Sequence, residues 1–67
     1  MNKELLRSIM ILHGETNSDL ADLLGISEAS VSSKINEKNT EFKQGEIAKI
    51  RLHYNLSDKQ VTDIFFA

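Results

Sequence analysis

The sequence contains no cysteine and no proline, and its two histidines, His13 and His53, lie far apart along the chain. The lack of cysteine excludes disulfides and thiolate metal sites, and the distance between the histidines leaves no spacing typical of a metal cage. The residues also fail to supply a nucleophile–base pair or a phosphate-binding glycine loop. We therefore expect a protein that is not an enzyme and that holds neither a metal nor another cofactor.

Long apolar runs are also missing, since no stretch approaches the roughly 20 residues that a membrane-spanning helix needs. The first residues include Lys3, Glu4 and Arg7 in place of the apolar segment of a signal peptide. With 67 residues, of which 40% are hydrophobic, the chain has the size and composition of one small globular domain. We expect a single soluble intracellular domain, residues 1–67, without a membrane partner.

The most informative stretch is TNSDLADLLGISEASVSSKIN, residues 16–36, which predicts two short helices joined by a tight turn. Thr16 is a good N-cap, and Asp19 three residues later forms an acidic variant of the capping box. Gly25 follows the first helix at a position where a left-handed residue can end it. The apolar residues of this first helix repeat at the spacing of one helical face: Leu20, Leu23 and Leu24.

The second helix of this stretch is predicted over residues 28–36, with Ser27 as its N-cap. Ile26 and Val31 stand at the two positions of a hydrophobic staple around that cap. Val31 and Ile35 are one turn apart and should point inward together. A helix, a glycine turn and a second helix in this order are typical of a DNA-binding helix-turn-helix.

Three further helices are predicted around this motif: one at residues 2–13, one at 44–54 and one that begins after its N-cap Ser57. A polar loop is predicted at 37–41, with Phe42 as its apolar anchor. In the first, we expect Leu5, Ile9 and Leu12 to form the buried stripe, with Leu6 and Met10 at its edge. The inner residues predicted for the last two helices are Ile47, Ile50, Tyr54, Val61, Ile64 and Phe65. The fold class is therefore all-α with five helices.

These residues also carry a family resemblance. TNSDLADLLGIS followed by EASVSSKIN resembles the helix-turn-helix of the Cro and repressor family of temperate phages. The tail FKQGEIAKIRLHYNLSDKQVTDIFF is similar to small phage and prophage regulators that end in a comparable IFF segment. The resemblance extends from Leu5 to Phe66. It implies a compact lambda repressor-like DNA-binding domain that regulates transcription in the cytoplasm of a bacterial host cell.

In proteins of this family the second helix of the motif lies in the major groove of operator DNA. The resemblance therefore implies that four small or polar residues face base edges: Glu28, Ala29, Ser32 and Ser33. Helical geometry agrees, because these positions are opposite Val31 and Ile35. The alternative is that they are simply small residues that face solvent.

Phosphate contacts are expected around the same helix. Asn17 stands where the family usually has glutamine, and Lys43 and Gln44 begin a helix whose free N–H groups attract phosphate. The full set of candidates is Asn17, Ser30, Lys34, Asn36, Lys38, Lys43 and Gln44. Each lysine could instead be an ordinary solvated surface charge.

The charge balance opposes DNA binding, since eight Lys and Arg residues face ten Asp and Glu residues. Glu28, Glu37 and Glu41 would repel phosphate unless Lys34, Lys38 or Lys43 neutralised them. We therefore expect weak binding by one copy and a homodimer on a two-fold operator.

Phe66 is the candidate dimer contact and belongs to an apolar C-terminus that also contains Ala67. The alternative is that the rings of Phe65 and Phe66 both close the core. The acidic composition and Glu28 favour a second function, that of an antirepressor or modulator that binds a phage repressor protein through the same fold.

Overall fold

The computed structural model describes residues 1–66, within which the chain forms five α-helices and no strand. The helices are α1 (Lys3–Leu12), α2 (Asn17–Leu24), α3 (Glu28–Ile35), α4 (Gln44–Tyr54) and α5 (Asp58–Phe65). The predicted all-α class and the two helices of the motif are thus confirmed. Ala67 lies outside the described residues. No helix in residues 1–66 has the length and apolar character needed to cross a membrane.

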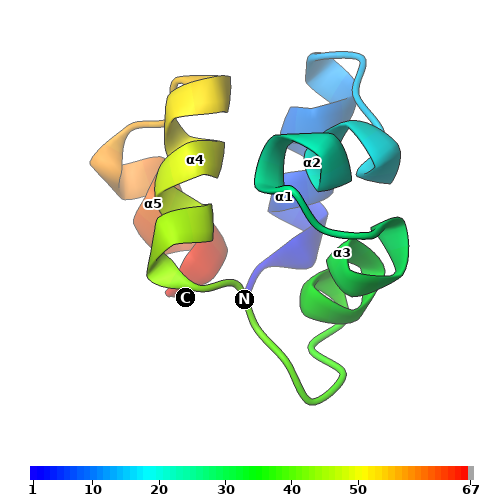
Figure 1. The fold of residues 1–67 in the computed structure, drawn as a ribbon. Coiled ribbons are helices and arrows are strands. Elements are labelled where there is room, and N and C mark those ends of the chain that lie inside the picture. Colours follow the sequence, from blue (N-terminus) through cyan, green and yellow to red (C-terminus); the bar gives the residue numbers. More distant parts are fainter. Residues whose placement is uncertain (67) are drawn as a thin grey trace.

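The helices form two neighbouring groups, α4 with α5 and α1 with α2 and α3 (Figure 1). α2 packs against both α3 and α4, while α5 packs against α1 and α4. α3 and the loop that follows it lie at one end of the molecule, away from the carboxyl ends of α1 and α4 (Figure 1). This arrangement leaves the outer side of α3 uncovered by the other helices.

Side-chain caps fix where the helices begin. The Ser27 Oγ accepts a hydrogen bond of 3.1 Å from the N–H of Ser30 at the start of α3. At α2, the Asp19 carboxylate accepts the N–H of Thr16 at 2.8 Å. Asn2 and Ser57 cap α1 and α5 in the same way as Ser27 caps α3. Because Thr16, Asp19 and Ser27 were predicted in these roles from the sequence, local sequence determines where α2 and α3 begin.

The core is mostly aliphatic and draws on every helix. Its fully buried side chains are Leu6, Leu20, Val31, Ile35, Ile50 and Ile64. Phe42 is also buried and anchors the α3–α4 loop, as its position predicted. Its ring meets Phe65 edge to face, with the ring centroids 5.8 Å apart. This contact joins the loop to the end of α5.

The predicted buried stripe of α1 was wrong at Leu12, whose side chain is 82% exposed. The inward residues are Leu6, Ile9 and Met10, and Leu5 is half-buried. The reason is the continuous apolar run from Ile9 to Leu12, which fits two rotations of the helix equally well. Packing against α5 selects the rotation that buries Leu6, and Leu12 then points to solvent.

Two glycines should respond oppositely to alanine. Gly25 ends α2 in the left-handed region, with φ of 69°, whereas Gly45 lies within α4, and neither position has an atom that would obstruct a Cβ. We expect Gly25→Ala to lower the free energy of unfolding by about 1–2 kcal/mol, because a Cβ strains that conformation. Gly45→Ala should raise it by about 0.5–1 kcal/mol. Urea denaturation of both variants checks this, and a stabilising Gly25→Ala would contradict the assigned turn.

Candidate nucleic-acid interface

α3 presents two chemically different sides. Val31 and Ile35 are buried against the core, and α2 provides the main helix contact. Away from these residues Ala29 and Ser32 are exposed, while Ser33 is half-buried. Glu28 is three residues before Val31 and so was wrongly predicted to lie opposite it, but it is exposed at the first position of α3. The helix therefore offers a narrow outer surface of small side chains to whatever approaches it. Small side chains allow the helix backbone to come close to a partner.

A shallow hollow joins this surface to the loop that follows α3. It is lined by Ala29, Ser30, Ser33, Lys34, Lys38 and Thr40. Residues predicted to face bases and residues predicted to contact phosphate thus lie side by side. Thr40 was not identified from the sequence, because it stands in a run of turn-forming residues that carries no helical register. Its place beside the hollow depends on how the loop folds back.

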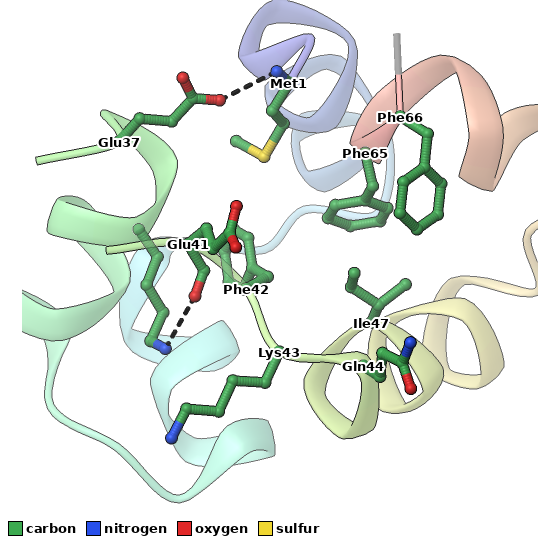
Figure 2. Close-up of a pocket in the computed structure, with 10 residues that line it drawn as sticks. Met1, Glu37, Glu41, Phe42, Lys43, Gln44, Ile47, Phe65 and Phe66 are labelled. Carbon is green, nitrogen blue, oxygen red and sulfur yellow. Dashed lines mark hydrogen bonds and ion pairs between the residues drawn. The ribbon is translucent and has the colours of Figure 1, made fainter. Parts of the chain in front are cut away.

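Lys34 differs from the other predicted phosphate contacts because its side chain is buried. Only 8% of the residue is exposed. Its Nζ donates to the Glu46 carboxylate at 2.9 Å and to the main-chain oxygen of Glu41 at 3.3 Å. The ammonium therefore joins α3 to the loop and to α4, and it is not free at the surface. In Figure 2 a dashed line marks the hydrogen bond that the main-chain oxygen of Glu41 accepts.

Glu46 is held by two donors at the start of α4. Its Oε1 accepts the Lys34 ammonium and, at 2.9 Å, the main-chain N–H of Lys43. Burial alone would raise the pKa of the Glu46 carboxyl, but the Lys43 N–H and the Lys34 ammonium together hold that pKa below its usual value. Glu46 is therefore charged at neutral pH and ties the first turn of α4 to α3.

The remaining predicted phosphate contacts fall into two groups. Asn17, Lys38, Lys43 and Gln44 are exposed. Ser30 and Asn36 are half-buried and already hydrogen-bonded within the chain, Ser30 to the Ser27 hydroxyl and Asn36 to Ser32. The exposed cations near α3 are thus Lys38 and Lys43, one in the loop and one beside the first turn of α4.

Several acidic side chains are paired. Asp58 meets Arg51, Asp63 meets Lys59, and Glu37 meets the Met1 ammonium at 2.9 Å. The first two pairs belong to α4 and α5 and are not part of the outer surface of α3. Glu28, in contrast, is exposed at the start of α3. The net negative charge therefore overstates the acidity of the surface around α3, where the exposed Glu28 and Glu41 remain as opposing charges.

A second polar cluster lies at the carboxyl ends of α1 and α4. The Glu15 carboxylate is 2.8 Å from His53 Nε2, and His13 packs on Tyr54. The neighbouring Tyr54 hydroxyl and His53 hold the pKa of the Glu15 carboxyl below its usual value, and burial raises the pKa of Tyr54. Within residues 1–66 no three His, Cys, Asp or Glu side chains are placed to hold a metal ion. The cluster fastens the α1–α2 turn to α4.

Comparison with known proteins identifies the family. Residues 5–64 match the family model described as Cro/C1-type HTH DNA-binding domain. Neither the curated proteins nor the solved structures gave a match. The matched segment covers nearly the whole chain and includes all of α2 and α3. It therefore includes the helix-turn-helix that was predicted at residues 16–36. The chain is a member of the Cro/C1-type helix-turn-helix DNA-binding domain family, and it is a DNA-binding regulator.

Proposed function

We propose that this domain is a sequence-specific transcriptional regulator of phage or prophage type, which inserts α3 in the major groove of operator DNA in a bacterial cytoplasm. The observation that carries the proposal is the two-sided character of α3, with Val31 and Ile35 buried and Glu28, Ala29 and Ser32 exposed. Such a helix fits the major groove, which accepts an α-helix and presents a distinct pattern for each base pair.

The proposed base contacts follow from the chemistry of the outer side chains. Glu28 accepts a hydrogen bond from the amino group of cytosine, so its negative charge faces a hydrogen-bond donor. Ala29 contacts the methyl group of thymine. Ser32 and Ser33 exchange hydrogen bonds with base edges. None of these residues is a long cation, so specificity depends on close approach rather than on charge.

The proposed phosphate contacts are Lys38, Lys43, Gln44 and Asn17, because all four are exposed. Lys34 is not included, since its ammonium is already paired with Glu46. Two lysines supply little electrostatic attraction, and one copy of the domain should bind weakly. Two copies on a two-fold operator would recover the affinity, because the second contact is then intramolecular.

Phe66 is the proposed contact between two copies. Its side chain is 67% exposed, whereas Phe65 is half-buried beside it. Both rings line one pocket with Met1, Phe42 and Ile47, next to the first turn of α4 (Figure 2). The same pocket is also lined by polar and charged residues, among them Glu37, Glu41 and Lys43. An exposed aromatic ring beside such a pocket provides a small anchor for a partner chain.

Four substitutions test the groove model. Lys38→Ala and Lys43→Ala should weaken binding to every duplex and lower the salt slope of the binding constant by about one for each lysine removed. Ala29→Leu and Ser33→Ala should instead change which sequence is preferred. Selection from a randomised duplex library, followed by salt titrations, measures both effects. Unchanged affinity, slope and preference in all four variants would exclude the model.

A second candidate function is that of an antirepressor or modulator that binds another regulator. It is favoured by three exposed apolar side chains near the carboxyl ends of α1 and α4, which lie away from α3: Ile11, Leu12 and Leu52. Nuclease-treated pull-downs from cells that carry a related prophage test it. A repressor retained by the unmodified domain and lost with Leu12→Ser and Leu52→Ser would support this function, and no retained repressor would exclude it.

A further inference from the structure

The side chain of Asn36 folds back along α3 and contacts Ser32. Its Nδ2 lies 3.0 Å from the main-chain oxygen of Ser32 and 3.4 Å from the Ser32 Oγ. Because a carbonyl oxygen only accepts hydrogen bonds, the amide must turn its NH₂ group, and not its oxygen, toward Ser32. The Ser32 hydroxyl therefore accepts a hydrogen bond from Asn36.

In this contact the Ser32 hydroxyl is an acceptor, so its own proton remains available for donation. A serine hydroxyl within a helix often donates to the carbonyl oxygen four residues earlier. Ser8 does so in α1, where its Oγ is 3.0 Å from the Glu4 oxygen. Among residues 1–66, no group accepts a hydrogen bond from the exposed Ser32 hydroxyl. Ser32 therefore presents a donor to solvent or to a bound partner.

Given the proposed position of α3 in the major groove, on which this inference depends, we propose that Ser32 reads the operator as a hydrogen-bond donor and that Asn36 is its positioning residue. Purine N7, guanine O6 and thymine O4 are acceptors in the groove, whereas cytosine offers only its amino donor. A cytosine opposite Ser32 would leave the hydroxyl proton unpaired in a dehydrated contact, which is costly. Cytosine should therefore be disfavoured at that one position.

The test uses the full chain and a duplex selected by it, with each base of a half-site replaced in turn. Fluorescence anisotropy gives the affinities of the unmodified domain and of Ser32→Ala, Asn36→Ala and the double variant. At one position, the unmodified domain should discriminate against cytosine by about 3- to 10-fold. Both single variants should lose that discrimination, and the double variant should lose no more. Ser8→Ala, whose hydroxyl is already used within α1, is the matched control and should change nothing.

Loss of overall affinity does not decide the matter, because a merely structural role for Asn36 would reduce binding to all duplexes alike. The readout is the ratio of affinities at one position, together with thermal melting that shows each variant folded. Full discrimination by Asn36→Ala, or a Ser32-dependent position at which cytosine is preferred, would overturn the inference while leaving the proposed function intact. Failure of the unmodified domain to select any duplex would overturn both.

Discussion

Replacing Ile35 by alanine should lower the free energy of unfolding by about 2–5 kcal/mol. Ile35 is 1% exposed and holds α3 against the rest of the core. The substitution removes buried methyl groups and leaves a cavity that the neighbouring helices fill only in part. Since a domain of this size has only a few kcal/mol of stability, much of the variant should be unfolded at room temperature. Urea denaturation followed by circular dichroism gives the value.

Leu12→Ala is the matched control for this prediction. It also shortens a branched aliphatic side chain in a helix, but Leu12 is 82% exposed. Its effect on the free energy of unfolding should stay within about 0.5 kcal/mol. An Ile35→Ala variant that melts as the unmodified domain does, or a Leu12→Ala variant that is strongly destabilised, would show that the core is assigned to the wrong residues.

The second large effect is expected for Lys34→Ala, which should cost about 1–3 kcal/mol of unfolding free energy. The substitution leaves the largely buried Glu46 carboxylate without its ammonium partner and removes the hydrogen bond to Glu41. DNA binding distinguishes this role from a phosphate contact. The salt slope should stay unchanged for Lys34→Ala, measured where the variant is folded, and should fall by about one for Lys38→Ala. A lower slope for Lys34→Ala would mean that its ammonium reaches DNA.

The same pair predicts how stability depends on pH. The pKa of Glu46 is lower in the folded domain than its usual value of 4.5, so its contribution to stability is present above that value. It should be lost as the pH falls from about 4.5 through the folded pKa. Glu46→Gln should therefore be less stable than the unmodified domain at neutral pH and should lose less stability on acidification. Equal acid sensitivity of the two proteins would exclude this role of Glu46.

Local sequence was sufficient to predict the helices, because the signals that begin and end them lie within a few residues. Thr16 and Ser27 cap α2 and α3 as predicted, and Gly25 adopts the left-handed conformation at the end of α2. The outward position of Ala29 and Ser33 could also be predicted, since burial of Val31 and Ile35 determines which residues lie opposite.

The errors and omissions arise where distant residues decide the outcome. The rotation of α1 depends on α5, which a continuous apolar run cannot reveal, and Leu12 was misplaced for that reason. The pairing of Lys34 with Glu46 spans 12 residues and two helices. Side-chain hydrogen bonds such as that from Asn36 to Ser32 depend on rotamers, which residue type alone does not determine.

The most direct test of the central claim, that α3 enters the major groove, is dimethyl sulfate footprinting of the domain on a selected operator. This reagent methylates guanine N7 in the major groove and adenine N3 in the minor groove, so it reports which groove is covered. We predict protection of guanine N7 in two half-sites about 34 Å apart, as expected for two copies on one face of the duplex. Protection confined to adenine N3, with guanine N7 fully reactive, would contradict the account.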